Sequence, residues 1–347
     1  MPGTLVRFAW AGENRGVTTV ASLYGPVAED LQLVEDTLDL TAQTDFLPLQ
    51  EMLQSVLSRG GKRLRPAIAL LSGGFGEYDA QNQVLLATSI ELLHTATLVH
   101  DDVIDASETR RGQPTANASF DNAATVMLGD YMFAHAAELV ARTSHVGVIR
   151  LFAQTLKTMA TGELRQDINA YDAESASMRD YYARIYGKTA SLFETAGTGG
   201  ALMSGATPEV VSALGEYGRC LGMAFQIVDD VLDFTATAAE LGKPVGGDLL
   251  AGTLTLPSIL LMEEASGGDV VRRLFASEDE GERESLLAEA LGSIRAGDIL
   301  ERSQATALEW QGRAVASLEG LTSPSGRGNP QREALEGIAA FVVSRKF

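Results

Sequence analysis

Apolar residues recur along this chain with the three- and four-residue spacing of amphipathic helices. The clearest case is an apolar run over residues 82–105 without proline or glycine, which predicts one long helix, and residues 208–234 predict a second. No segment shows the alternation typical of a β-strand. We predict further helices at residues 26–57 in two segments, and at 66–71, 122–143, 146–170, 177–196, 257–264, 270–275, 282–291, 294–318 and 331–345. The GTGGA run at 197–201 predicts either a bend or tight helix packing.

Each of the two long helices ends in three aspartates with the pattern DDxxD. Carboxylates four residues apart lie on one helix face and repel each other, and at a helix C-terminus they also oppose the helix dipole. Mg²⁺ relieves such crowding and is usually held by one or two carboxylates plus substrate phosphates. One cluster alone would be read as a solvated helix end, but two at corresponding places favour a metal–diphosphate site. The six residues are Asp101, Asp102, Asp105, Asp229, Asp230 and Asp233.

Composition narrows the possible partners. The chain has 347 residues, 45% of them hydrophobic, and a net charge of −19, which argues against nucleic acid as a partner. A single cysteine, Cys220, excludes an intramolecular disulfide and fits the reducing cytoplasm. The sequence contains no run of about 18 uncharged apolar residues, so it predicts no membrane span. We expect a loose extension over residues 1–24 and one all-helical domain over residues 25–347.

A basic cluster stands out in this acidic chain. The segment GGKRLRP at 60–66 places Lys62, Arg63 and Arg65 together. Basic residues at a helix end commonly complement the helix dipole. The alternative is an anion site, because arginine suits bidentate phosphate contact.

Several motifs together resemble one family, the trans-type polyprenyl diphosphate synthases. The resemblance covers nearly the whole chain from about residue 25. It implies an all-α isoprenoid-synthase bundle around a central cavity and a homodimer. It also implies Mg²⁺-dependent head-to-tail condensation of isopentenyl diphosphate with an allylic diphosphate such as farnesyl diphosphate. The motifs are GGKRLRP at 60–66, ELLHTATLVHDDVID at 91–105, RRG at 110–112, GD at 129–130, GKT at 187–189, FQIVDDVLD at 225–233 and GKPVGGD at 242–248.

The resemblance also implies roles for individual residues. The six aspartates would hold two or three Mg²⁺ ions on the allylic diphosphate, which makes pyrophosphate a better leaving group. The cationic clamp on that diphosphate would comprise Arg110, Lys188 and Lys243, with Thr189 and Gln226 beside it. Lys188 is counted with the aspartates as catalytic. The isopentenyl diphosphate site would comprise Lys62, Arg65, His94 and Arg111.

The same resemblance bears on product length. In this family, the residues four and five positions before the first aspartate gate the tunnel in which the product grows. Here they are Thr97 and Ala96, both small, and no aromatic residue occurs between residues 82 and 105. Small residues also permit close helix packing. The family position favours an open tunnel and a long product, from heptaprenyl to decaprenyl, and at most peripheral membrane contact when that product is released.

Three other functions remain open at this point. A shorter-chain synthase making farnesyl or geranylgeranyl diphosphate would share every motif. A class I terpene cyclase would need no second diphosphate site, so the intact GGKRLRP segment and Arg111 argue against it. A non-catalytic subunit should have lost aspartates from the two clusters, and none is lost.

Overall fold

The computed structural model describes residues 20–110, 112–175, 177–235, 245–322 and 329–345. Nearly all regular structure in these ranges is helical, which confirms the predicted fold class. The helices are α1 (Val20–Leu23), η1 (Gly25–Val27), α2 (Ala28–Thr41), α3 (Leu47–Leu57), α4 (Leu64–Gly73), α5 (Ala80–Ile104), α6 (Ala116–Ser119), α7 (Asn122–Arg142), α8 (Val146–Ile168), η2 (Ala173–Ser175), α9 (Met178–Ile185), α10 (Ser191–Met203), α11 (Pro208–Thr235), α13 (Gly247–Leu250), α14 (Leu256–Met262), α15 (Ala265–Ala276), α16 (Glu280–Ala296), α17 (Ile299–Ser317) and α18 (Pro330–Ser344).

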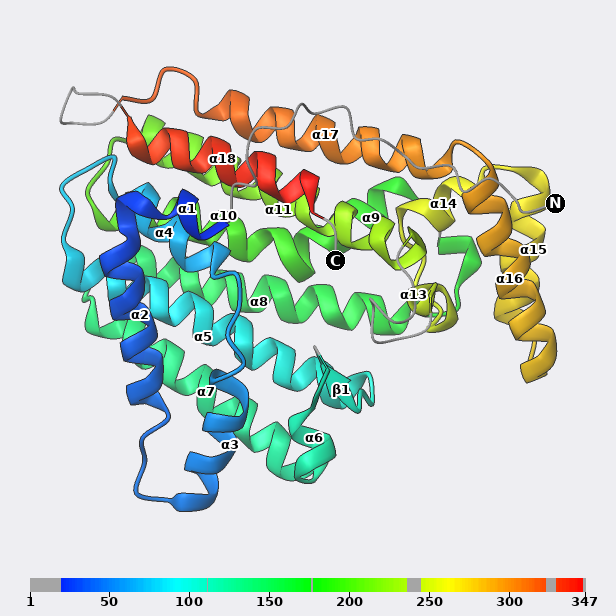
Figure 1. The fold of residues 1–347 in the computed structure, drawn as a ribbon, viewed down its shortest axis with the longest axis horizontal. Helices are drawn as coiled ribbons and strands as arrows, with labels where there is room; N and C mark the ends of the chain where they lie inside the picture. The colour runs from blue at the N-terminus through cyan, green and yellow to red at the C-terminus, as the bar shows by residue number, and fades with distance from the viewer. Residues whose placement is uncertain (1–19, 111, 176, 236–244, 323–328, 346–347) are drawn as a thin grey trace.

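Helix α5 lies at the centre of one half of the bundle (Figure 1). It packs against α2, α4, α7 and α10, so nearly every side of it is covered. This explains its apolar sequence, because a helix buried all round has no polar face. Asp79 begins the helix, and its side chain accepts hydrogen bonds from the backbone N–H groups of Gln81 and Asn82.

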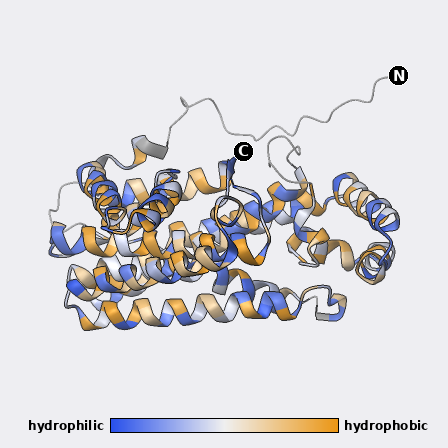
Figure 2. Ribbon diagram, turned by 90° about the horizontal axis from the view of Figure 1, so that it is seen from below, coloured by the Kyte–Doolittle hydropathy of each residue, from blue (hydrophilic) through white to orange (hydrophobic). Residues whose placement is uncertain are grey.

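The other long helix, α11, packs between α10 and α17. Most outer helices carry one hydrophobic and one hydrophilic side (Figure 2), and the hydrophobic sides form one continuous core. Of the predicted extension, residues 1–19 lie outside the described residues, and α1 packs against α18.

Glycines allow α10 to approach its neighbours closely. A methyl group on Gly200 would lie 2.1 Å from the carbonyl oxygen of Ala69 in α4. One on Gly218 of α11 would lie 2.2 Å from the carbonyl oxygen of Phe193. Helix α10 continues through residues 197–201, so the GTGGA run marks tight packing and the alternative of a bend is wrong.

Other elements differ from the sequence pattern. The helix predicted over residues 294–318 is two helices, because Gly297 ends α16 in extended backbone. The helix predicted over residues 177–196 is interrupted by a π-helical turn, Tyr186–Ala190, between α9 and α10. Two antiparallel strands of two residues each, β1 (Thr109–Arg110) and β2 (Gln113–Pro114), form a short hairpin. Strands this short lack the alternation from which a sequence predicts them.

Candidate active site

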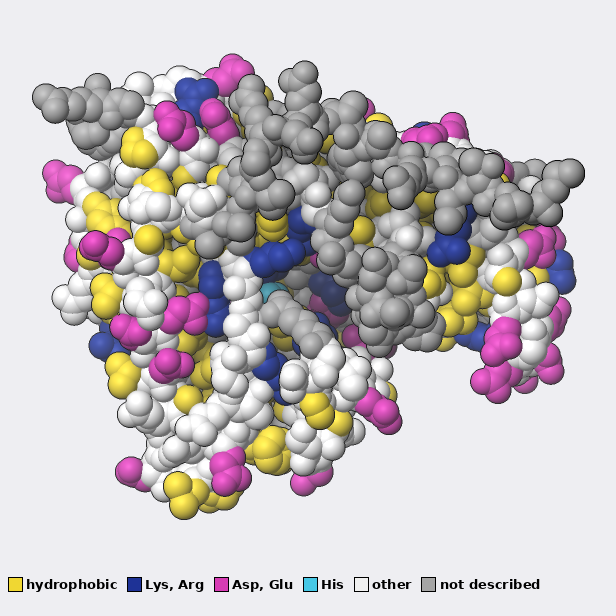
Figure 3. Space-filling view, in the orientation of Figure 1, with side chains coloured by type: hydrophobic (Ala, Val, Ile, Leu, Met, Phe, Trp, Pro, Cys, Tyr) yellow, Lys and Arg dark blue, Asp and Glu magenta, His cyan; other side chains and the backbone are white. Residues whose placement is uncertain are grey.

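A cavity of about 510 Å³ lies beside the C-terminal end of α5. Its walls include one aspartate from each acidic cluster, Asp102 and Asp229, together with several cationic side chains. Figure 3 shows Lys, Arg and His side chains gathered around a hollow near the middle of the molecule. The chain therefore brings the two predicted clusters to one cavity. Its basic and histidine lining residues are Arg59, Lys62, Arg63, Arg65, His94, Arg110 and Arg345.

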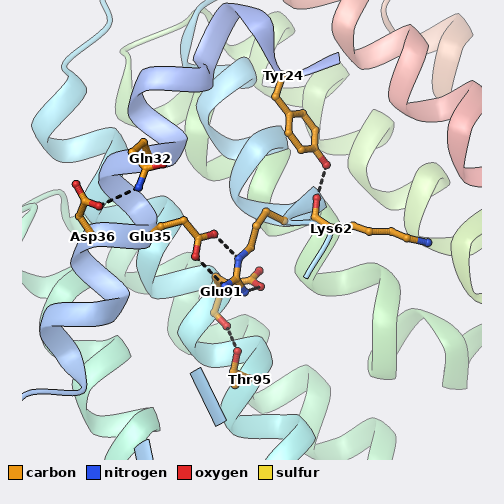
Figure 4. Close-up of polar contacts among 8 residues, drawn as sticks. Tyr24, Gln32, Glu35, Asp36, Lys62, Glu91 and Thr95 are labelled. Carbon is orange, nitrogen blue, oxygen red and sulfur yellow. Dashed lines mark hydrogen bonds and ion pairs between the residues drawn. The ribbon is translucent and has the colours of Figure 1, made fainter. Parts of the chain in front are cut away.

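The basic segment before α4 is held in place by a partly buried ion-pair cluster. Arg63 has a left-handed backbone, with φ of 47°. Its side chain donates to both carboxylate oxygens of Glu35 in α2, at 2.5 and 2.9 Å, and to Glu91 of α5 at 2.7 Å. In Figure 4, Glu35 and Glu91 lie close together, and the Lys62 side chain extends away from both of them. Tyr24 donates a further hydrogen bond to the backbone carbonyl of Lys62. Arg63 thus anchors the segment that carries Lys62.

The three described residues predicted for isopentenyl diphosphate, Lys62, Arg65 and His94, all line this cavity. Arg65 is buried, and its guanidinium lies 4.3 Å from the centroid of the Phe193 ring. Burial lowers the pKa of Arg65 to about 10. Its Nε atom has no hydrogen-bond partner among the described residues, and a buried donor without a partner is costly. An anion in the cavity would satisfy it.

The first acidic cluster contains three differently placed carboxylates. Asp102 is buried and accepts a 2.7 Å hydrogen bond from Arg110 of β1, whereas Asp105 is exposed as the C-cap of α5. The pKa of Asp101 is raised to about 6, mainly by burial, with Glu163 and Asp105 adding to the effect and Lys188 opposing it. Asp101 therefore lies in a poorly solvated position where its negative charge is costly.

Lys188 approaches this cluster from the π-helical turn. Its Nζ atom lies 3.0 Å from Oε2 of Glu163 in α8. Burial would lower the pKa of Lys188, but Glu163 and Asp101 outweigh it and hold the pKa above its ordinary value. Gly162 and Gly187 pack against each other nearby, since a methyl group on either would lie 3.0 Å from the other's backbone. Functional sites often contain such π turns.

In the second cluster, Asp230 is engaged with side chains of the protein itself. Buried Asp230 accepts hydrogen bonds from Tyr181 at 2.6 Å and Gln226 at 2.9 Å, and Gln226 accepts one from Thr189 at 2.6 Å. Burial raises the pKa of Asp230 to about 7, and Asp248 adds to the effect. These contacts make Asp230 a residue that orders the cavity wall.

The remaining two aspartates of this cluster differ from each other. Buried Asp233 accepts a 3.2 Å hydrogen bond from the backbone N–H of Asp248. Asp229 lies 3.0 Å from Arg345 and lines the cavity. Asp229 is therefore better placed than Asp230 or Asp233 to meet a bound ligand.

Other predicted site residues are either outside the described residues or placed differently from the prediction. Arg111 and Lys243 are outside the described residues. Arg110, predicted for the allylic side, lines the same cavity as Lys62 and Arg65. Of the two predicted gate residues, Ala96 is completely buried in the hydrophobic core, whereas Thr97 is partly exposed.

The carboxylates of the two clusters fit a magnesium ion that takes its remaining ligands from the phosphates of a bound substrate. Among the described residues, no group of three or more His, Cys, Asp or Glu side chains could hold a metal by itself. Asp101 and Asp105 at the end of α5, and Asp229 on α11, supply carboxylates in ones and twos. That is the number Mg²⁺ uses when phosphates supply the other ligands.

Several site residues could not be found from the sequence. Glu163, Tyr181 and Arg345 each act through a partner at least 25 residues away. Their local sequence shows no spacing that would single them out. Phe225 lies inside the FQIVDDVLD segment, but only the structure shows arginines packed against its ring.

The all-helical bundle, with acidic clusters at the ends of two long helices, defines an isoprenoid-synthase fold. The chain belongs to the polyprenyl synthetase family, whose model matches residues 47–292. It is 37% identical to heptaprenyl diphosphate synthase component 2 of Bacillus subtilis, covering 93% of this chain and 90% of that protein. It is 36% identical to octaprenyl diphosphate synthase of Escherichia coli, over 92% and 96% of the two chains. The crystal structure of heptaprenyl diphosphate synthase from Staphylococcus aureus matches with a TM-score of 0.85 and 32% identity, over 91% and 98%.

The family relationship confirms the predicted enzyme class, a prenyltransferase of isoprenoid biosynthesis. Among the described helices, none combines the length and the apolar character that a membrane span requires.

Proposed function

We propose that this chain elongates an allylic diphosphate with isopentenyl diphosphate, in a Mg²⁺-dependent head-to-tail condensation that releases pyrophosphate. One observation carries the proposal. A single cavity combines aspartates from both acidic clusters with Lys62, Arg65 and His94. Such a cavity accommodates one diphosphate through metal and a second through cationic side chains. We also propose that residues 25–347 act as a single domain.

The two diphosphates are held differently. Lys62, Arg65 and His94 bind isopentenyl diphosphate, with Arg65 supplying a buried donor that needs an acceptor. Asp229 lines the cavity, and Asp101 and Asp105 belong to the same end of α5 as the lining residue Asp102; these three present carboxylates for the metal-bound allylic diphosphate. When bound, Mg²⁺ neutralises the diphosphate and makes it a better leaving group. Lys188 adds a positive charge beside Asp101.

Asp102 and Asp230 have a different role in this proposal. Arg110 engages Asp102, and Tyr181 and Gln226 engage Asp230. They position the cavity wall, so we revise their predicted role as direct metal ligands. Leu98, Val99 and Phe225 are apolar lining residues that help to exclude water, which would otherwise quench the allylic cation left after ionisation.

We propose a long product, from heptaprenyl to decaprenyl diphosphate. The small side chains of Ala96 and Thr97 support it, as do relatives named heptaprenyl and octaprenyl diphosphate synthase. Incubating the purified chain with MgCl₂, farnesyl diphosphate and isopentenyl diphosphate, with mass analysis of the products, tests this. Long polyprenyl diphosphates support the proposal. A cyclic terpene, or farnesyl diphosphate left without elongation, would refute the function, whereas geranylgeranyl diphosphate as the final product would refute the length alone.

We propose that the chain forms a homodimer through α7 and α8. Exposed positions of α7 recur every three or four residues, and four of them are alanines, at 123, 134, 137 and 141. Met127 on the same face is 68% exposed, and Leu164 and Ile168 of α8 are 62% and 76% exposed. Exposed apolar residues at this spacing are typical of a helix that packs against another helix.

Light scattering after gel filtration tests this assembly. Met127→Asp should give monomers, whereas Leu47→Asp, at another exposed apolar position, should leave the dimer intact. The Bacillus subtilis relative is named as one component of its enzyme. If this chain alone were a folded but inactive monomer, a second component would replace the homodimer proposal. We further propose that the enzyme acts in the cytoplasm and contacts the membrane only peripherally, when the product is released.

A further inference from the structure

Arg345 is the last residue that the structure describes, yet its side chain is only 7% exposed. Its Nη2 atom lies 3.0 Å from Oδ1 of Asp229 and donates a 3.0 Å hydrogen bond to the backbone carbonyl of Phe225. The guanidinium lies 3.9 Å from the centroid of the Phe225 ring. The residue that follows α18 is thus fixed beside the second acidic cluster by a charged pair and a cation–π contact.

Arg345 also lines the 510 Å³ cavity, together with Lys62, Arg65 and His94. Its positive charge adds to the effect of burial in lowering the pKa of Arg65. Like charges gathered in a poorly solvated cavity are costly unless an anion lies between them. Arg345 therefore borders two anion positions, the Asp229 carboxylate and the cavity that faces Arg65.

We propose that Arg345 changes partner during substrate binding: it pairs with Asp229 in the metal-free enzyme and binds the diphosphate of isopentenyl diphosphate once a divalent cation occupies Asp229. This rests on the proposed function of the cavity. A cation on Asp229 replaces the charge that Arg345 supplies. A guanidinium binds phosphate as readily as carboxylate. The move is short because both anions border one cavity.

The exchange couples the two sites thermodynamically. Metal binding at Asp229 releases Arg345 for the diphosphate, so metal strengthens isopentenyl diphosphate binding, and linkage requires the reverse as well. Removing the Arg345 charge then has opposite effects at the two sites. The metal loses a competitor, whereas the diphosphate loses a ligand. A side chain that merely stabilised the fold would weaken both.

Two binding measurements on Arg345→Gln test the exchange. The first is the melting temperature of the substrate-free protein across a MgCl₂ series, because a ligand of the folded state raises it. The second is calorimetric titration with isopentenyl diphosphate at saturating MgCl₂. The variant should need at least threefold less MgCl₂ for half of the stabilisation, and should bind isopentenyl diphosphate about tenfold or more weakly. Arg332→Gln, which removes a surface arginine of α18 paired with Glu336, should match wild type in both.

Arg345→Lys separates charge from shape. It should keep the wild-type MgCl₂ requirement but recover only part of the isopentenyl diphosphate affinity, because lysine lacks the planar fork. A loss of both affinities in Arg345→Gln, or no change in either, would overturn the exchange. If wild-type protein does not bind isopentenyl diphosphate at all, the proposed function fails and the exchange with it. If wild type binds and elongates normally while Arg345→Gln is unchanged, only the exchange fails.

Discussion

At the scale of single residues, buried carboxylates make the metal-free site a source of instability. The pKa of Asp101 is raised to about 6 from an ordinary 3.8. Between these two values the folded protein keeps a proton that the unfolded chain has lost. The free energy of unfolding therefore falls as pH rises from about 4 to about 6. Asp230, with its pKa raised to about 7, extends this fall towards neutral pH.

We predict that Asp101→Asn raises the stability of the protein in EDTA. The gain should be absent near pH 4 and complete above pH 6, on the order of 2–3 kcal/mol for a shift of about two pKa units. Urea unfolding at pH 4.5, 6.0 and 7.5 measures it. Asp167→Asn, at an exposed position of α8, serves as the control and should follow wild type. If the free energy of unfolding of Asp101→Asn depended on pH as that of wild type does, the raised pKa assigned to Asp101 would be wrong.

A second residue-scale prediction concerns the positioning of Lys188. Glu163→Gln removes the carboxylate 3.0 Å from its ammonium group, so Lys188 loses the contact that aims it at the first cluster. The KM for farnesyl diphosphate should rise about three- to tenfold, with a smaller change in kcat and in the KM for isopentenyl diphosphate. Steady-state kinetics on both substrates decide this. Glu289→Gln, at an exposed position of α16, is the matched control, and equal effects on the two KM values would refute the assigned role.

At the scale of helices, glycine contacts set how closely α10 and α11 approach. Gly218→Ala would place a methyl group 2.2 Å from the Phe193 carbonyl oxygen, and backbone cannot yield as a side chain can. We predict a loss of about 1–3 kcal/mol in the free energy of unfolding. Gly292→Ala in α16 meets nothing within 4 Å and should instead gain up to about 1 kcal/mol. Urea unfolding of the two variants should show opposite signs, and a stabilised Gly218→Ala would contradict the packing.

Helix positions were largely predictable, because the apolar spacing that buries one side of a helix is written in the sequence. Both acidic clusters were found for the same reason, since each ends a long apolar run. The π-helical turn and the break at Gly297 were not, because the apolar spacing continues across both. Arg63 and Arg345 were not assigned as anchoring or cavity residues either. Their partners, Glu35, Glu91 and Asp229, are at least 28 residues away, and only folding brings them together.

At the scale of the whole molecule, the length of the product tests where the growing chain lies. Ala96 is completely buried, so a large residue there would also strain the core. Thr97 is partly exposed and gives the cleaner test. Thr97→Phe should shorten the product towards farnesyl or geranylgeranyl diphosphate while turnover persists. Chromatography of dephosphorylated products measures this, with Thr97→Val as the control. An unchanged product from Thr97→Phe would show that the chain does not pass this residue.

The π-helical turn at Tyr186–Ala190 has one more consequence, which concerns insertions and deletions. A π turn holds an additional residue, and each residue of an α-helix advances the side chains by about 100°. Deleting one residue between Ile185 and Ser191 would restore a regular helix and rotate α9 out of phase with α10. One deletion would therefore break two contacts, the hydrogen bond from Tyr181 to Asp230 and the ion pair between Lys188 and Glu163. A substitution, by contrast, removes one contact at a time. This wall of the active site is therefore encoded by the number of residues in the turn as well as by their chemistry.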